Sequence, residues 1–161
     1  KAEQIVERWH DALVVAADTI VVLDGDILGK PRDEQDAIQM LMRLRNRTHQ
    51  VTTGVMLLNA GNGKICQSAI ETDVVIRDYT SDEIAQYVAS GESLDKAGGY
   101  AIQDRDFAPV AKADGCYLNV VGLPVCALEL LLAQAGHPEI LRTGRLVSEE
   151  CWKCTLGEAS R

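Results

Sequence analysis

The feature that most constrains this chain is a nearly continuous apolar run over residues 12–23, rich in valine. An unbroken run of this kind is typical of a strand buried on both faces, as the central strands of α/β sheets are. Asp18 and Thr19 are its only strongly polar residues. Because a buried carboxylate is costly unless it is paired, metal-bound or open to a cleft, Asp18 is a candidate for chemistry. The alternative is a turn cap or an ion pair, and Thr19 suits a strand in either case.

Strand-like and helix-like patterns alternate along the rest of the chain. Asp24-Gly25-Asp26 predicts a tight hairpin after the first strand. Helical spacing and capping residues predict helices over residues 2–9, 34–45, 80–90 and 125–135. Apolar runs predict further strands over residues 50–59, 64–77, 100–102 and 114–121. The alternation predicts an α/β domain with a mixed sheet and helices packed on it.

Composition limits the classes of partner. The chain has 161 residues and a net charge of −8, so it offers no broad basic field for nucleic acid. No apolar run is long enough to cross a bilayer, so no membrane partner is expected. A small anionic substrate would need a local cluster of basic side chains or a bridging divalent cation.

The cysteines indicate reduced thiols. They number five, an odd count scattered over apolar segments, which does not suit a disulfide framework. Cys151 and Cys154 form one CxxC motif, which lacks the second ligand pair of a structural zinc site. The three histidines lie far apart in the sequence. An ordinary tail is the favoured interpretation, with a zinc or thiol role as the alternative.

Two loops carry polar residues that suit a phosphate or a base. Lys30 lies in Gly29-Lys30-Pro31, where the glycine lets a ligand approach the backbone and the proline stiffens the exit. Residues 95–103 supply a carboxylate, the ammonium of Lys96, two glycines and the amide of Gln103, which can bond the polar edge of a base. A solvated lysine and an exposed glutamine after a turn are the alternatives.

Several segments in a fixed order are more specific than any one of them. They are residues 17–21 (Ala-Asp-Thr-Ile-Val), 28–31 (Leu-Gly-Lys-Pro), 40–41 with Leu44, 48–55 (Thr-His-Gln-Val-Thr-Thr-Gly-Val), 95–103 (Asp-Lys-Ala-Gly-Gly-Tyr-Ala-Ile-Gln) and 119–124 (Asn-Val-Val-Gly-Leu-Pro). In order and spacing they resemble the Maf family. The resemblance implies a twisted α/β sheet with flanking helices and a central cleft, similar to the inosine triphosphatases. It also implies a cytoplasmic nucleoside triphosphate pyrophosphatase that uses Mg²⁺ or Mn²⁺ to release a monophosphate and pyrophosphate.

The resemblance also implies roles for single residues. Asp18 matches the proposed catalytic base and would bind the divalent metal. Lys30 matches a phosphate-facing lysine, Lys1 matches an earlier lysine in a Lys-Ala pair, and Lys96 is a further substrate contact. Thr19 and Gln103 match the branch that acts on dTTP and UTP, whereas the branch associated with 7-methyl-GTP has glutamate at both positions. The expected partner is therefore a small nucleoside triphosphate.

The chain also departs from the family pattern. The family opens with a strand and a Ser-x-x-Arg segment that residues 1–136 lack, so we expect a Maf-like domain over 1–136 without that segment and a tail over 137–161. Residues 104–106 (Asp-Arg-Asp) replace a glycine-rich stretch. The resemblance also implies a link to septum inhibition and to the clearing of unwanted nucleotides. The alternative function is a non-catalytic nucleotide-binding regulator of cell division and septum formation. Related proteins are often homodimers, but the sequence defines no interface.

Overall fold

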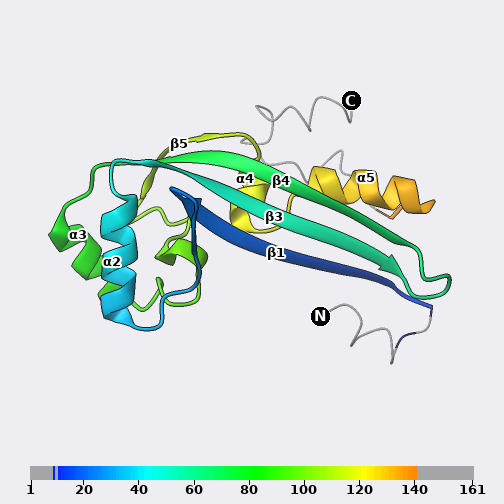
Figure 1. Ribbon diagram of the computed structural model, residues 1–161, viewed down its shortest axis with the longest axis horizontal. Helices are drawn as coiled ribbons and strands as arrows, with labels where there is room; N and C mark the ends of the chain where they lie inside the picture. Colours follow the sequence, from blue (N-terminus) through cyan, green and yellow to red (C-terminus); the bar gives the residue numbers. More distant parts are fainter. Residues whose placement is uncertain (1–8, 10, 141–161) are drawn as a thin grey trace. The chain divides into compact units, whose positions relative to one another are not determined.

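The computed structural model describes residues 9 and 11–140 (Figure 1). Its elements are β1 (Leu13–Leu23), β2 (Asp26–Leu28), α2 (Glu34–Leu44), β3 (Thr48–Asn59), β4 (Ile65–Ile76), α3 (Ser81–Ala89), the 3₁₀ helix η1 (Ala97–Gly99), β5 (Val110–Asp114), α4 (Tyr117–Val121) and α5 (Val125–Ala135). The strands form one sheet in the order β2-β1-β3-β4-β5. Helices and a sheet confirm the α/β class.

The chain divides into two compact units. Unit 2 comprises residues 19–52 and 71–115, and unit 1 comprises the described residues before 19, residues 53–70 and those from 116 onward. The long strands β1, β3 and β4 each contribute residues to both units. The expected helix over residues 2–9, Lys1 and the tail that holds Cys151 and Cys154 lie almost entirely outside the described residues.

Unit 2 begins with the predicted hairpin. Asp24 has φ 54° and Gly25 has φ 87°, and two consecutive positive φ angles match the twist of the flanking strands. β1 and β2 then pair antiparallel, with Val21 opposite Leu28. Arg47 stabilises the turn, because its Nη2 donates hydrogen bonds to both carboxylate oxygens of Asp24 at 2.6 and 2.7 Å. The hairpin prediction is confirmed.

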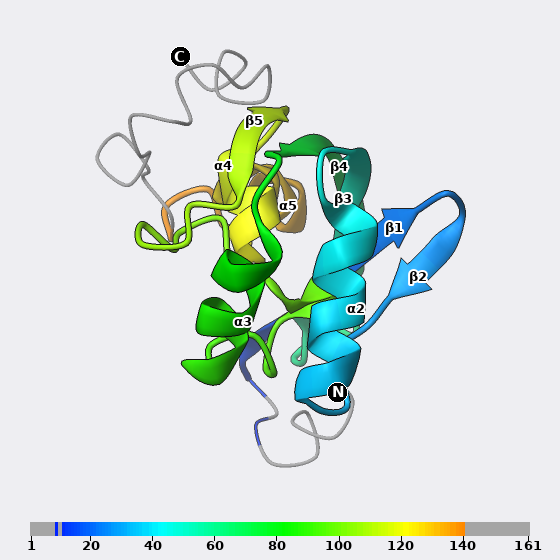
Figure 2. The same ribbon diagram turned by 90° about the vertical axis from the view of Figure 1, so that its left-hand side faces the viewer.

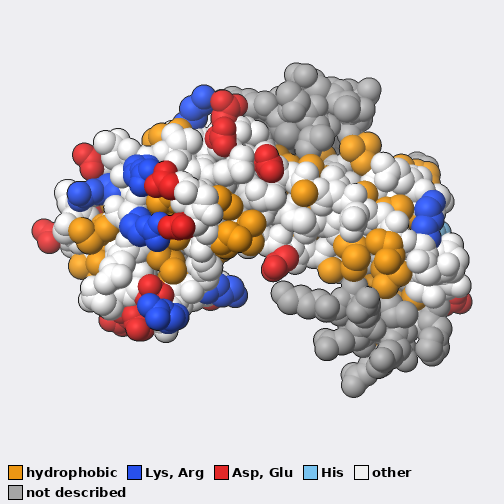
Figure 3. Space-filling model, viewed as in Figure 1, with side chains coloured by type: hydrophobic (Ala, Val, Ile, Leu, Met, Phe, Trp, Pro, Cys, Tyr) orange, Lys and Arg blue, Asp and Glu red, His pale blue; other side chains and the backbone are white. Residues whose placement is uncertain are grey.

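The helices of unit 2 begin where their capping residues predict. The side chain of Asp33 accepts from the amide of Asp36 at 2.8 Å to cap α2. Thr80 and Glu83 form a complete capping box at the start of α3. α2 packs against α3 and η1, and Figure 2 shows α2 beside α3. On the face drawn in Figure 3, acidic and basic side chains alternate over these helices, so that face carries no broad basic field.

Unit 1 contains a core between α5 and the sheet. Val55 and Leu57 of β3 are buried against a leucine stripe on α5, which consists of Leu128, Leu131 and Leu132. Figure 1 shows α5, in orange, running along the strands. The hydroxyl of Thr53 donates to the carbonyl of Asn119 at 2.9 Å and ties β3 to α4. The predicted helix over residues 125–135 is confirmed with the same bounds.

Two expected strands are wrong. Residues 100–102 form no strand: Gly98 and Gly99, with φ 71° and 73°, bend the chain just before them, Tyr100 is extended but unpaired in the described sheet, and a turn begins at residue 102. In the range 114–121, β5 ends at Asp114 and α4 begins at Tyr117. Gly115, with φ 136°, separates them. An apolar run as short as 117–121 fits one helical turn as well as a strand, so periodicity does not distinguish the two.

β1 is also less buried than its sequence predicts. Val14, Val21 and Leu23 are buried, but Val15 is 42% exposed. β2 is short and pairs only with Val21, Val22 and Leu23, so in the described part of the chain the remainder of β1 has a neighbouring strand on one side alone. The exposed Val15 and Asp18 also show that β1 is not buried on both of its faces along its whole length, so that expectation is wrong.

Gly115 provides a test of this fold. A Cβ at this position would lie 2.9 Å from Thr72 Oγ1 and 3.2 Å from Thr72 Cα, on a backbone with positive φ. We expect Gly115→Ala to lower the free energy of unfolding by about 2 kcal/mol or more, measured by urea denaturation. Gly54→Ala is the matched control, since a Cβ there meets nothing within 4 Å. Equal stability of the two variants would contradict the packing of β4 on the β5–α4 junction.

Candidate functional site

Asp18 lies in the part of β1 that belongs to unit 1, and it lines a cavity. The cavity measures about 610 Å³, and Asp18, Gln67 and Ser68 supply its polar lining. Small residues at neighbouring strand positions, Ala16 and Gly54, leave the space open. The Asp18 side chain is exposed, so its charge does not carry the cost of complete burial. A carboxylate beside a polar-lined cavity is suited to hold water or a cation next to a bound ligand.

Unit 2 brings together the two glycine loops that the sequence singled out. The amide of Gly98 donates to the carbonyl of Gly29 at 3.0 Å. A Cβ on Gly98 would lie 3.2 Å from the Val21 side chain, and one on Gly99 would lie 3.3 Å from Pro31. Only glycines, which also tolerate the positive φ of both positions, allow this approach. The loop that carries Lys30 and the loop of residues 95–103 therefore form one surface.

Lys96 is already bound to acidic partners within that surface. Its ammonium donates to Asp95 Oδ1 at 2.6 Å, to the Glu92 carbonyl at 2.6 Å and to Glu92 Oε2 at 3.3 Å. The hydrogen bond from Lys96 lowers the pKa of Asp95, and the charge of Lys30 contributes to the same shift. Lys30 thus lies close enough to Asp95 to affect it. The role of Lys96 as a phosphate contact stays a prediction, since its ammonium would have to share these partners.

Thr19 and Gln103, the expected base contacts, both lie in unit 2. Thr19 is half-buried in β1, and Gln103 is exposed in the turn that follows η1. The Asp104 side chain sets the shape of the next turn, residues 104–107, because its Oδ1 accepts from the amides of Asp106 at 3.1 Å and Phe107 at 2.8 Å. Asp104 therefore closes the loop by hydrogen bonding at the position where the family pattern is rich in glycine.

Sequence reasoning missed a buried pair beneath the loop of residues 95–103. His49 Nε2 lies 2.7 Å from the hydroxyl of Tyr100, and the two rings meet edge to face. His49 is 4% exposed, and burial lowers its pKa to about 4. Its Nδ1 has no hydrogen-bond partner among the described residues, so a protonated ring would hold a buried charge with an unpaired N–H at Nδ1. Only the contact of His49, on β3, with Tyr100, which is distant in sequence, distinguishes it from a surface histidine.

The residues of the site fit a divalent cation only together with a ligand. In the part of the chain that the structure describes, no three His, Cys, Asp or Glu side chains are grouped to hold a metal. Mg²⁺ is commonly bound by one or two carboxylates, with waters and substrate phosphates completing its shell. A single exposed carboxylate at Asp18 fits that mode. The same described residues include no helix long and apolar enough to cross a membrane.

Comparison with known proteins shows which family and which relatives the chain resembles. The family model described as Maf-like protein matches residues 1–135. A dTTP/UTP pyrophosphatase from Dictyoglomus turgidum is 45% identical over 137 residues, which cover 85% of this chain and 71% of the relative. A protein of the same name from Dehalococcoides mccartyi (strain CBDB1) is 43% identical over 157 residues, 97% of this chain and 70% of the relative.

A third relative agrees with the first two. The dTTP/UTP pyrophosphatase of Clostridium botulinum (strain Eklund 17B / Type B) is 44% identical over 136 residues, which cover 84% of this chain and 72% of the relative. The chain belongs to the Maf family. The resemblance that the motifs indicated is confirmed.

The buried pair predicts how stability depends on pH. The pKa of His49 is about 4 in the folded protein and 6.5 ordinarily, so its contribution is complete above pH 6.5 and is lost as the pH falls toward 4. Between pH 7 and pH 5 we expect the wild type to lose about 2 kcal/mol more stability than His49→Gln. Urea denaturation at both pH values measures this. Parallel losses in the two proteins would show that His49 does not titrate in this way.

Proposed function

We propose that this protein is a nucleoside triphosphate pyrophosphatase that converts dTTP and UTP to the monophosphate and pyrophosphate. One observation carries the proposal. The Gly29-Lys30-Pro31 loop contacts the loop of residues 95–103 through the hydrogen bond from the Gly98 amide to the Gly29 carbonyl. Relatives that are 40–45% identical and cover most of the chain carry the name dTTP/UTP pyrophosphatase. The relatives support this substrate class, and the hydrogen bond joins the two loops that carry Lys30 and Gln103.

Asp18 has the role of catalytic base in this proposal. Its exposed carboxylate lines the cavity with Gln67 and Ser68, whose polar atoms can help to hold a water. The base orients the attacking water and accepts its proton as the bond to phosphorus forms. A divalent cation, Mg²⁺ or Mn²⁺, would share Asp18 with the triphosphate and offset the charge on its oxygens.

Lys30 has the role of phosphate contact. A lysine ammonium is a compact point charge. The loop that carries Lys30 is held by the hydrogen bond from Gly98 to Gly29 and by the close approach of Gly99 to Pro31. Bracing limits the entropy that the side chain and the loop lose when an anion binds. In a protein with a net charge of −8, such a local cation and the metal would overcome the general repulsion of a triphosphate. Lys1 is proposed as a second phosphate contact on the family pattern alone.

Thr19 and Gln103 have the role of base selection. A glutamine amide both donates and accepts, so it can match the N3–H and O4 edge that thymine and uracil share. Glutamate at the same position would present acceptors only. The exposed amide of Gln103, on a turn closed by the hydrogen bond from the Asp104 amide to the Ala101 carbonyl, has the chemistry that this selection needs.

Three further properties stay predictions from the family resemblance. They are a cytoplasmic location, a homodimer, and a cellular role in clearing nucleotides or in restraining septum formation. A gel-filtration mass of the purified protein would test the second of them.

The reaction itself tests the proposal. We expect pyrophosphate release from dTTP and UTP with Mg²⁺, and we expect Asp18→Asn to lower kcat by about 100-fold or more because it removes the base. Asp73→Asn is a matched control, since it changes another exposed strand carboxylate. Full activity of Asp18→Asn would exclude the catalytic role. Binding of dTTP by calorimetry without any release would favour the non-catalytic regulator instead.

Base selection has a separate test. We expect Gln103→Glu to lower kcat/KM for both dTTP and UTP by about 10- to 100-fold, because the glutamate has no donor for the base edge. Gln39→Glu, at an exposed position on α2, controls for the added charge and should leave kcat/KM unchanged. An unchanged kcat/KM in Gln103→Glu would show that the base is selected elsewhere.

A further inference from the structure

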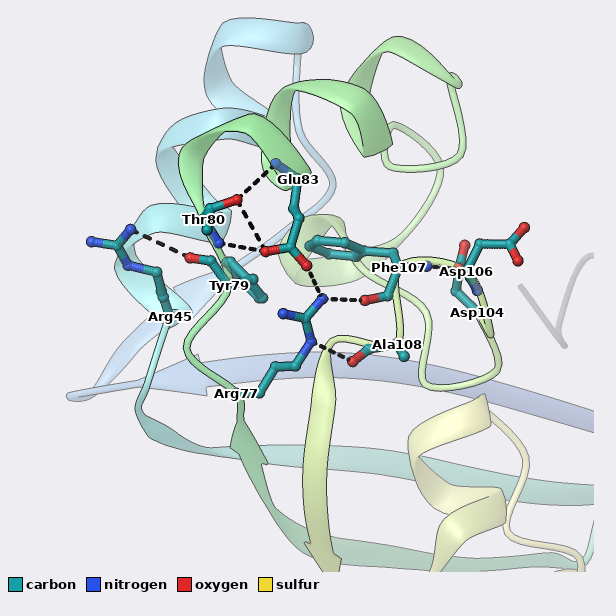
Figure 4. Close-up of polar contacts among 9 residues, drawn as sticks. All are labelled: Arg45, Arg77, Tyr79, Thr80, Glu83, Asp104, Asp106, Phe107 and Ala108. Atoms are coloured by element: carbon teal, nitrogen blue, oxygen red, sulfur yellow. Dashed lines mark hydrogen bonds and ion pairs between the residues drawn. The ribbon is translucent and has the colours of Figure 1, made fainter.

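Arg77, the residue after β4, binds a loop that follows Gln103. Its Nη2 donates to the Phe107 carbonyl at 2.6 Å, and its Nε donates to the Ala108 carbonyl at 2.9 Å (Figure 4). Ala108 has φ 42°, a left-handed conformation that an alanine rarely adopts. A guanidinium bound to consecutive carbonyls can hold the backbone in that conformation, because its donors are fixed in one plane.

Glu83 holds the guanidinium from the other side. Its Oε1 accepts from Arg77 Nη2 at 2.6 Å, and its Oε2 accepts from the Thr80 amide at 2.7 Å and the Thr80 hydroxyl at 3.0 Å. Figure 4 shows the carboxylate between Thr80 and Arg77. The bond from Arg77, followed by those from Thr80, lowers the pKa of Glu83 to about 2. Glu83 is therefore charged throughout the neutral range and fixes both the start of α3 and the orientation of Arg77.

Aromatic contacts also hold the loop of residues 104–108. The ring of Phe107 stacks on Tyr87 at 4.3 Å between centroids, and it lies 4.9 Å from the ring of Tyr79. The Arg77 guanidinium lies 5.5 Å from the Tyr79 centroid and 5.7 Å from that of Phe107. Phe107 is thus held by its ring and by its carbonyl, so its backbone position is set by two independent contacts.

Hydrogen bonds continue from Phe107 to the turn that presents Gln103. The Phe107 amide donates to Asp104 Oδ1 at 2.8 Å, and the Asp104 amide donates to the Ala101 carbonyl at 3.2 Å. Gln103 lies between Ala101 and Asp104 in the sequence, within the turn that the second bond closes. A displacement of Phe107 would therefore reach Gln103 through Asp104.

We propose that Arg77 is a positioning residue for base recognition, which holds residues 104–108 so that the Gln103 amide is presented in one orientation. This rests on the proposed function, because it assigns Gln103 to the pyrimidine edge. Arg77 acts through the loop and does not touch the nucleotide. A lysine retains the charge that pairs with Glu83, but its single ammonium lacks the fork that binds two successive carbonyls.

A double-mutant cycle tests the coupling. We expect Arg77→Lys to lower kcat/KM for dTTP and UTP by about tenfold, mainly through KM, because the base contact is loosened. In the Gln103→Ala background the same substitution should change kcat/KM by less than about twofold, since the group it positions is gone. Additive effects in folded variants would overturn the proposal. Arg43→Lys, which alters an exposed pair with Asp26 at 2.7 Å, should leave kcat/KM unchanged.

Hydrogen exchange gives a second readout that does not depend on turnover. We expect Arg77→Lys to speed exchange at the amides of Asp106 and Phe107, while the α2 amides exchange as in the wild type. Unchanged exchange at these two amides would overturn the loop-holding role of Arg77. A wild-type protein that releases no pyrophosphate overturns the proposed function, whereas a wild type that turns over with an additive cycle overturns only the role of Arg77.

Discussion

The hydrogen bond from the Gly98 amide to the Gly29 carbonyl is the contact on which the surface of unit 2 depends. It joins two loops that are far apart in the sequence, and it needs a residue without a side chain, because a Cβ on Gly98 would crowd Val21. This bond fixes the loop that holds Lys30 against the loop that leads to the turn of Gln103. The Gly-Lys-Pro and Ala-Gly-Gly motifs therefore have a common physical reason, which is the close approach of two segments of the same chain.

Charge in this acidic protein is arranged in local pairs. Lys96 forms ion pairs with Glu92 and Asp95, and Arg77 forms an ion pair with Glu83. Both cations therefore have carboxylate partners within the protein. The hydrogen bond from Lys96 lowers the pKa of Asp95, and the charge of Lys30 adds to the same shift, so the loop of residues 29–31 faces the same charge network. A triphosphate that binds at Lys96 would compete with Glu92 and Asp95 for its ammonium, and this is a physical reason for a divalent metal to accompany the triphosphate.

The sequence predicted the elements whose signals are local. The Asp24-Gly25 turn, the Asp33 cap and the Thr80–Glu83 capping box each involve residues within a few positions of one another, and each is confirmed. The strands expected at residues 100–102 and 114–121 were wrong, since short apolar runs have no period long enough to identify them. The burial of β1 was overestimated, because burial depends on what packs against each face of the sheet, which the run itself does not reveal.

By itself the sequence determined the family, the order of the motifs and the identity of Asp18, Lys30 and Gln103 as candidates. Only the tertiary structure decided which partners meet: Gly98 with Gly29, His49 with Tyr100, and Arg77 with the carbonyls of residues 107 and 108. A pattern records the chemistry of a side chain and its near neighbours. A hydrogen bond between distant residues depends on the path of the whole chain, and backbone carbonyls, which every residue has, leave no mark in the sequence.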